Sequence, residues 1–321
     1  MVNMKSPFII GDVGSNHRGH LELALKHLEV GKACGLDAVK FQLYSSEELY
    51  GQPNDNVDSW SVRREWLPAL KECADKLGVE FMCSSFSREG YQYVDPFVNI
   101  HKIASSEALC PLIAETVRNF GKPIIISTGA LSANEVHWLI DQNTGHDLTL
   151  LECVTNYPAD IAHYNLAAMA NWGRLAKVGI SDHTLDEVLA CAAVGAGATM
   201  FEKHFDAAPS LGTTPDSGVS VSDYNMVDYV NAIRLAFSAL NSGHKTPAHQ
   251  HASMLRYRRR PIATINLKAG DVLELGKNYG NFRSLVDDTR GAPAQSVREF
   301  DQRVLNTDIL AGQALWFTDL V

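Results

Sequence analysis

The sequence predicts a protein of the α/β class, with a (β/α)8 TIM barrel followed by a small, mostly β domain. Three observations support this prediction. Eight short runs rich in apolar and β-branched residues recur between residues 8 and 204. Segments with the periodicity of amphipathic helices separate these runs. The repeating part ends near residue 240, and eight strand–helix units within that length match the roughly 250 residues of such barrels.

The eight runs are apolar on both faces, as parallel strands covered by helices are. In chain order they occupy residues 8–14, 38–43, 79–85, 100–105, 123–128, 148–153, 177–181 and 199–204. Helical patterns are clearest at 63–77, 186–197 and 223–240. A doubly wound open sheet is the alternative, but it does not need eight units. No GxGxxG motif follows the first run, which disfavours a dinucleotide site.

The chain changes character after Leu240. We expect residues 1–240 to form the barrel, the polar residues 241–254 a linker, and residues 255–321 the small domain. Two similar stretches, NLKAGDVL (266–273) and DILAGQAL (308–315), each place Ala-Gly between apolar runs, which is typical of turns. A domain of this size has a thin core, so it is expected to rely on the barrel or on a partner subunit.

Composition limits the classes of function. The formal net charge of −9 and the lack of a long basic run argue against nucleic acid as a partner. The first residues do not resemble a signal peptide, and no apolar stretch approaches the roughly 20 residues that span a membrane. None of the six cysteines forms a CxxC pair, which is typical of reduced thiols. We therefore expect a cytoplasmic protein that binds neither nucleic acid nor membrane.

Polar residues gather where the predicted strands end, which is where barrels of this type hold their active sites. Lys40 and Lys102 lie inside apolar strands, and a buried ammonium group needs an anion. One interpretation is a ligand phosphate or carboxylate, assisted by hydroxyl groups such as those of Ser105, Ser127 and Ser181. The alternative is a structural ion pair between each lysine and a neighbouring carboxylate.

Two histidines, His183 and His204, end neighbouring predicted strands. A pair of imidazoles at a barrel mouth suits Mn²⁺, Fe²⁺, Co²⁺ or Zn²⁺ and leaves coordination positions open for water or substrate. Glu202 precedes His204 by two residues, so both side chains point to the same side of an extended strand. The alternative is that these are structural or exposed histidines, since the chain has twelve.

The motifs that carry these residues resemble those of the sialic acid synthases. In order they are GDVGSNHRG, DAVKFQ, FMCSSFSREG, HKIASSE, KPIIISTG, LLECVTNYPA, GISDHT and FEKHFD. The C-terminal segment resembles the antifreeze-like (SAF) domain of these enzymes. The resemblance implies a transferase of carbohydrate biosynthesis that condenses phosphoenolpyruvate with an N-acyl hexosamine, such as N-acetylmannosamine. The products are a nonulosonic acid and phosphate, formed with metal assistance and cleavage of a C–O bond. It also implies a homodimer whose SAF domain caps the partner's site.

The resemblance further implies a role at each matching position. The residues matched to the phosphoenolpyruvate pocket are Lys40, Ser84, Lys102, Ser105, Ser127, Thr155 and Ser181. Those matched to the sugar are Asp12, Gln42, Glu107, Tyr157 and Asp216, with Arg283 or Arg290 reaching it from the small domain. The implied metal ligands are His183 and His204, with Mn²⁺ the usual ion. The expected catalytic residues are Glu202, Lys40, Lys102 and Asp12.

Some positions depart from the family pattern. Asp12 stands where glutamate is usual, Glu152 replaces a histidine, and a longer loop, PSLGTTPDSG, places Ser217 where histidine is usual. These changes leave the identity of the sugar open. Two alternatives remain: another phosphoenolpyruvate-dependent deoxy-sugar acid synthase, which the FEKHFD motif and the small domain disfavour, and a non-catalytic sugar-binding homologue, which the two lysines disfavour.

Overall fold

The computed structural model describes residues 6–240, 257–284 and 291–321. The chain divides into two compact units, Met1–Ser242 and Gly243–Val321, and each is described by itself. The expected linker at 241–254 and the candidate Arg290 lie outside the described residues.

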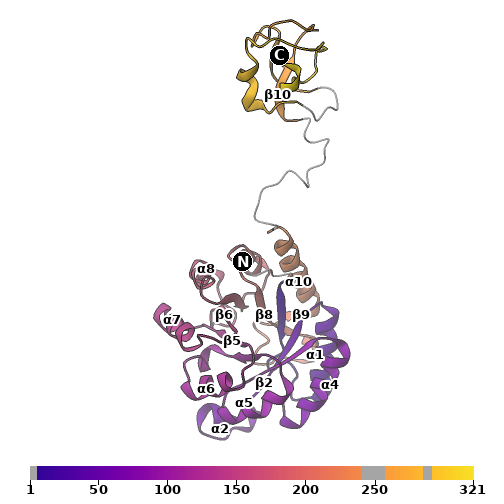
Figure 1. Ribbon diagram of the computed structural model, residues 1–321. Coiled ribbons are helices and arrows are strands. Elements are labelled where there is room, and N and C mark those ends of the chain that lie inside the picture. Colours follow the sequence, from indigo (N-terminus) through magenta and orange to yellow (C-terminus); the bar gives the residue numbers. More distant parts are fainter. Residues whose placement is uncertain (1–5, 241–256, 285–290) are drawn as a thin grey trace. The chain divides into compact units, whose positions relative to one another are not determined.

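The first unit is a barrel of parallel strands (Figure 1). Its eight strands are β1 (Phe8–Asp12), β2 (Ala38–Leu43), β3 (Glu80–Ser85), β4 (His101–Ile103), β5 (Ile124–Ser127), β6 (Leu148–Cys153), β7 (Lys177–Asp182) and β8 (Met200–Asp206). They pair in the order β3-β2-β1-β8-β7-β6-β5-β4, and β3 also contacts β4, so the sheet is nearly closed. A two-residue strand, β9 (Val221–Ser222), pairs with β8. The predicted α/β barrel is confirmed.

Helices cover the outside of the barrel (Figure 1). They are α1 (Leu21–Ala33), α4 (Leu67–Leu77), α5 (Arg88–Val94), α6 (Pro111–Asn119), α7 (Ala133–Gln142), α8 (Leu166–Trp172), α9 (Val188–Gly195) and α10 (Asp223–Ser238). Two short helices that the sequence pattern did not predict, α2 (Ser46–Tyr50) and α3 (Asp55–Asp58), lie in the connection after β2. The helix expected at 63–77 begins as an α-helix only at Leu67, because Pro68 suits the first turn of a helix.

An apolar layer fills the interior of the barrel below the strand ends. It consists of the side chains of Ile10, Ala38, Met82, Ile125 and Leu151. Alternate residues of a strand share a face, so the residues two positions further along point into the same interior. These residues, all buried, are Asp12, Lys40, Ser84, Ser127 and Cys153. A polar layer therefore lies directly above the apolar one at the carboxyl ends of the strands.

Gly179 allows β7 and β8 to approach closely. A Cβ atom at Gly179 would lie 2.1 Å from the carbonyl oxygen of Met200 and 2.8 Å from Cδ2 of Leu151. Any larger residue would push the two strands apart, which is a common reason for glycine within a strand. Because β7 and β8 lead to His183 and His204, this glycine also affects the spacing of the two imidazoles.

The second unit is a small β structure with its own core. Strands β10 (Arg259–Ala263) and β11 (Tyr279–Arg283) pair in antiparallel fashion, and an apolar cluster includes Leu273, Phe300 and Leu315. The two similar stretches of sequence pair with each other through Leu267 and Ile309. Their glycines, Gly270 and Gly312, have φ angles of 96° and 84°, in the left-handed region that turns require. The predicted turns are thus present.

His17 ties the turn after β1 to the connection that contains α3. Its Nε2–H donates to the carbonyl oxygen of Trp60 at 3.1 Å, and the amide of Gly19 donates to Nδ1 at 3.0 Å. The bond from the Gly19 amide requires a neutral imidazole, since a protonated Nδ1 is no longer an acceptor, whereas the Nε2–H bond can form in either state. Burial, reinforced by the neighbouring His27, lowers the pKa of His17 to about 4.

Acid is therefore expected to destabilise the fold through His17. In the unfolded chain the imidazole has its ordinary pKa, so the unfolded state takes up the proton first as the pH falls. The contribution to stability is complete above about pH 6.5 and is lost between there and about pH 4, with roughly 2 kcal/mol gone at pH 5. Urea unfolding of the wild type and of His17→Gln, at about pH 6.5 and at about pH 4, measures this loss of stability. The variant, which does not titrate, should lose correspondingly less stability, and equal losses would contradict the assignment.

Candidate active site

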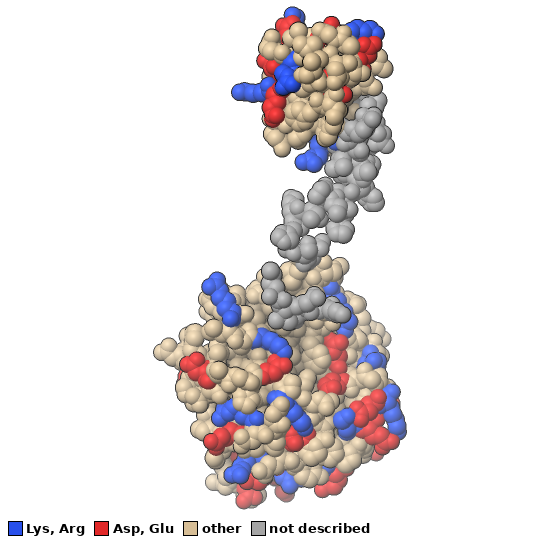
Figure 2. All heavy atoms as spheres, in the orientation of Figure 1, with Lys and Arg blue, Asp and Glu red and all other residues tan. Residues whose placement is uncertain are grey.

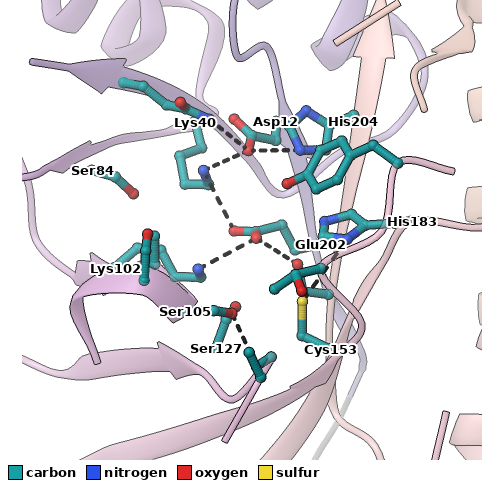
Figure 3. A pocket seen from close by; sticks show the side chains of 18 of the residues that line it. Asp12, Lys40, Ser84, Lys102, Ser105, Ser127, Cys153, His183, Glu202 and His204 are labelled. Atoms are coloured by element: carbon teal, nitrogen blue, oxygen red, sulfur yellow. Dashed lines mark hydrogen bonds and ion pairs between the residues drawn. The ribbon is translucent and has the colours of Figure 1, made fainter. Parts of the chain in front are cut away.

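A cavity of about 560 Å³ opens above the polar layer, at the carboxyl ends of the strands (Figure 3). Most of the predicted site residues line it, namely Asp12, Lys40, Gln42, Ser84, Lys102, Ser105, Ser127, Thr155, Tyr157, Ser181, His183, Glu202, His204 and Asp216. Glu107 is not among the lining residues, and its carboxylate accepts a hydrogen bond from the Ser106 hydroxyl. Arg283 ends β11 in the other unit. The two lysines and two histidines on which the sequence interpretation rests do converge.

Three ion pairs connect the lysines to carboxylates within the cavity (Figure 3). Lys40 Nζ lies 2.7 Å from Asp12 Oδ2 and 3.8 Å from Glu202 Oε2. Lys102 Nζ lies 3.4 Å from Glu202 Oε1, which also accepts a hydrogen bond from the Ser181 hydroxyl at 3.0 Å. Glu202 therefore lies between the two ammonium groups. The ion pairs that were the alternative to a bound anion are therefore present. They line the cavity, however, so the ammonium groups can also meet a ligand.

The carboxylates are kept charged by this arrangement. Burial opposes ionisation of Asp12, yet the Lys40 ammonium and His204 outweigh it and lower the pKa of Asp12 to about 2. Burial likewise opposes ionisation of Glu202, and Lys102 and Lys40 together hold its pKa below the usual range. The pKa of Lys40 is raised, because Asp12 and Glu202 outweigh its burial. At neutral pH these side chains form a buried, ionised cluster, in which electrostatic interactions are stronger than in bulk water.

Several polar atoms in the cavity have no hydrogen-bond partner among the described residues. Among the described residues, eight buried side-chain nitrogen or oxygen atoms lack a hydrogen bond, and four of them line this cavity. They are Ser84 Oγ, Ser127 Oγ, Glu202 Oε2 and His204 Nδ1. Buried polar groups are normally hydrogen-bonded, so a concentration of unpaired ones indicates a place for a polar ligand. The two hydroxyls and two ammonium groups can donate to an anion.

The two imidazoles have properties that suit a divalent metal. Their ring centroids are 5.6 Å apart, and the ring of Tyr157 packs against both. His183 Nδ1 donates to the carbonyl oxygen of Val154 at 2.6 Å, which leaves Nε2 available, as in most metal-bound histidines. Burial and His204 lower the pKa of His183 to about 4, so the ring is neutral, as a metal ligand must be.

A closed metal site is not formed by these side chains. In the parts of the chain that the structure describes, no three His, Cys, Asp or Glu side chains gather closely enough to hold a metal ion. A metal on the histidine pair would therefore keep most of its coordination positions for water or substrate. The donor set fits an open, catalytic type of site.

Cys153 is a lining residue that the sequence interpretation did not include. Its Sγ lies 3.9 Å from Nδ1 of His183. Burial raises the pKa of the thiol to about 11, so it is protonated at neutral pH. The alternation that places Leu151 in the apolar layer also predicts Cys153 in the cavity, and this signal was available in the sequence.

Comparison with known proteins assigns the chain to a family. Residues 27–245 match the model of the NeuB family. The chain belongs to the NeuB family. It is 34% identical to the N,N'-diacetyllegionaminic acid synthase of Legionella pneumophila over 282 residues, which cover 79% of each chain. It is 29% identical to a pseudaminic acid synthase of Campylobacter jejuni, covering 95% of this chain and 97% of that one.

A solved structure of a NeuB relative supports the same assignment. The N-acetylneuraminic acid synthetase of Leptospira borgpetersenii, crystallised with citrate, is 26% identical. Its TM-score is 0.73, and the match covers 80% of this chain and 94% of that one. The relatives are synthases of nonulosonic acids, and the chain spans most of their length.

Of the residues that differ from the NeuB pattern, Asp12, Glu152 and Ser217, some line the cavity and others do not. Glu152 is not a lining residue, and it accepts a hydrogen bond from the amide of Asn165 at 2.9 Å. The Ser217 hydroxyl accepts a hydrogen bond from the amide of Thr214 at 2.7 Å, within its own loop. Of the three changes, only Asp12 lies in the cavity. The lysines, hydroxyls and histidines are unaffected by the other two.

On the face of the first unit seen in Figure 2, acidic and basic side chains are interspersed, and no basic patch stands out. Within the described ranges, no helix combines the length and the apolar character that crossing a bilayer requires.

Proposed function

We propose that this protein condenses phosphoenolpyruvate with an N-acyl hexosamine to give a nonulosonic acid and phosphate. The observation that carries the proposal is the convergence of Lys40, Lys102, His183 and His204 on one cavity at the barrel mouth. The names of the relatives, which are synthases of legionaminic, pseudaminic and N-acetylneuraminic acids, support the same reaction class.

The donor is expected to bind at the lysine side of the cavity. Phosphoenolpyruvate carries a phosphate and a carboxylate, and Lys40 and Lys102 supply two ammonium groups on different strands. The hydroxyls of Ser84 on β3 and Ser127 on β5, which have no hydrogen-bond partner, add further donors. Charge-assisted hydrogen bonds of this kind hold both anionic groups and fix the enol carbon in a defined position.

The reaction forms one carbon–carbon bond and breaks one carbon–oxygen bond. The enol carbon C3 of phosphoenolpyruvate attacks the aldehyde carbon of the open-chain sugar, whose oxygen takes a proton and becomes a hydroxyl group. Water then adds to C2 and loses a proton. The resulting tetrahedral adduct expels phosphate with its bridging oxygen, and the new hydroxyl group at C2 gives up its proton to the departing phosphate, so C2 becomes a keto group.

Glu202 is the group best placed to take the proton from this water. Its Oε2 has no hydrogen-bond partner among the described residues, and it lies between the two lysines. An anionic donor that pairs with the lysines would weaken their hold on Glu202 and raise its pKa toward the usual range. A divalent ion on His183 and His204, for which Mn²⁺ is the family expectation, supplies Lewis acidity toward the aldehyde.

The remaining features of the proposal concern the assembly and the compartment. We extend it to a homodimer in which the SAF-like second unit caps the partner's cavity and contributes an arginine, with Arg283 the described candidate. A cytoplasmic location is supported by the six cysteines, all described and none in a disulfide.

The direct test is to mix the protein with phosphoenolpyruvate, Mn²⁺ and a panel of N-acyl hexosamines, with and without a phosphate group. Phosphate should be released only when a suitable sugar is present, and the product mass should equal that of the sugar plus one pyruvate. Turnover with phosphorylated aldoses alone would indicate a different deoxy-sugar acid synthase. Absence of turnover with every sugar, while sugars still bind, would indicate a binding protein.

Isotope-labelled water gives a second prediction about bond cleavage. If the C–O bond breaks, the bridging oxygen leaves with phosphate, and oxygen from labelled water does not enter the phosphate. Mass spectrometry of the released phosphate measures this, and the phosphate should remain unlabelled. Labelled phosphate would mean that the P–O bond breaks instead, and the proposed sequence of steps would be wrong.

A further inference from the structure

Arg18 has a left-handed backbone conformation, and every nitrogen of its side chain donates a hydrogen bond. Its φ angle of 51° lies in the left-handed region, which non-glycine residues adopt rarely and often at functional sites. The Arg18 side chain is 9% exposed, and its guanidinium forms a bidentate pair with the Asp206 carboxylate, at 2.6 and 3.1 Å. It also donates to the carbonyl oxygens of Asn16 at 2.6 Å and Gly212 at 2.7 Å. All three nitrogens are engaged, since Nε lies 3.3 Å from the Gly212 oxygen.

These bonds join two segments that are far apart in the sequence. Arg18 belongs to the turn after β1, Asp206 ends β8, and Gly212 lies in the loop that follows β8. That loop is the one that is longer than the family pattern. The same turn holds it at two further points: the Thr214 hydroxyl donates to Asn16 Oδ1 at 2.7 Å, and Asp216 Oδ2 accepts from the amide and hydroxyl of Ser15 at 2.7 and 2.6 Å.

The loop ends at a carboxylate that lines the cavity. A Cβ atom at Gly14 would lie 2.3 Å from Asp216 Oδ2, so the absence of a side chain there makes room for the carboxylate. Among the described residues, Asp216 forms no ion pair, and Oδ1 has no recorded hydrogen bond. The unpaired negative charge of Asp216 would repel the anionic phosphoenolpyruvate. We therefore expect Oδ1 to accept a hydrogen bond from a hydroxyl or N–H group of the sugar acceptor.

We propose that Arg18 is a positioning residue, whose guanidinium fixes the loop at 207–216 so that Asp216 presents Oδ1 to the hydroxyl or amide groups of the sugar acceptor. The assignment to the acceptor rests on the proposed synthase function. The side of the cavity that holds Lys40 and Lys102 does not depend on this loop, because those lysines come from β2 and β4. Loss of the Arg18 side chain should therefore weaken binding of the sugar and leave binding of phosphoenolpyruvate unchanged.

Arg18→Met tests this in steady-state kinetics. We expect the KM for the sugar to rise about tenfold, because a small displacement of a positioning group has effects of this size, while the KM for phosphoenolpyruvate stays within about twofold. Arg18→Lys keeps a charge for Asp206 but lacks the planar fork that also reaches Gly212, so it should raise the sugar KM as well. A general loss of structure would change both KM values together, and such a result would overturn the proposal.

A matched control is available on α10. Arg234 also donates to a glycine carbonyl, that of Gly35 at 2.7 Å, and lies 3.5 Å from the Asp37 carboxylate, but it is exposed and does not line the cavity. Arg234→Met should leave both KM values unchanged. Should Arg18→Met not fold, Thr214→Val removes another attachment of the same loop and should raise the sugar KM selectively.

Amide hydrogen exchange separates failure of this inference from failure of the proposed function. Exchange at residues 207–217 should be faster in Arg18→Met than in the wild type, and this measurement needs no substrate. Unchanged exchange would overturn the anchoring role. Faster exchange with an unchanged sugar KM would overturn the link to the acceptor. A wild-type protein without synthase activity but with the expected exchange would reject the proposed function and leave the anchoring role standing.

Discussion

Replacing His204 with alanine is expected to lower kcat by about 10³-fold or more, because it removes one of two imidazoles that can hold a Lewis acid worth several kcal/mol to the transition state. The fold should change little. His204 Nδ1 has no partner among the described residues, and Nε2 lies 3.5 Å from Asp12 Oδ2, so the substitution breaks no hydrogen bond recorded for the side chain. The melting temperature should stay within about 5 °C of the wild type.

Metal binding and turnover should be measured together on this variant. Titration with Mn²⁺ is expected to show weaker binding in His204→Ala by about 10²-fold or more, since the ion keeps a single protein ligand. His137→Ala is a matched control, because His137 is exposed on α7 and, among the described residues, its ring bonds only the carbonyl oxygen of Ala133. Wild-type turnover by His204→Ala after the metal has been stripped would exclude a metal role for this histidine.

The alternation of residues along the strands made much of the site predictable. Ala38 and Lys40 share a face of β2, and Met200 and Glu202 share a face of β8, so an apolar layer followed by a charged one can be read from the sequence. Closure of the barrel then brings the strand ends together, whatever their distance along the chain. This is why lysines and histidines from four separate motifs could be assigned to one cavity.

Other features depended on contacts that no local pattern contains. The sequence did not indicate that Glu202 lies between Lys40 and Lys102, because this follows from side-chain length and barrel geometry. Strand alternation places Glu152, between Leu151 and Cys153, on the outer face of β6, but the sequence did not indicate that the amide of Asn165 is its partner. Helices α2 and α3 are too short for a periodic signal, and their capping bonds decide their position.

Replacing Lys102 with methionine is expected to weaken phosphoenolpyruvate binding and to lower kcat/KM for this substrate by about 10³-fold. Methionine keeps most of the length of the side chain but removes the ammonium group and its hydrogen bond to the carbonyl oxygen of Ile103 at 3.3 Å. The hydrogen bond from the Tyr91 hydroxyl to the backbone carbonyl of residue 102 should persist. The variant leaves Glu202 buried with Lys40 at 3.8 Å and Ser181 as its remaining partners. Stability should fall by about 1–3 kcal/mol, less than for a buried charge that loses its only partner.

A double variant separates an anion site from a purely structural ion pair. If Lys102 served only to neutralise Glu202, Lys102→Met combined with Glu202→Gln would restore both stability and phosphoenolpyruvate binding. If the ammonium group binds the donor, the double variant regains stability but its Kd for phosphoenolpyruvate, measured by calorimetry, stays high. Lys177→Met is the control, since Lys177 is an exposed strand lysine that pairs with Asp147 at 2.6 Å outside the cavity. Recovery of tight binding in the double variant would therefore remove the main support for a donor site at the lysines, and with it the proposed reaction.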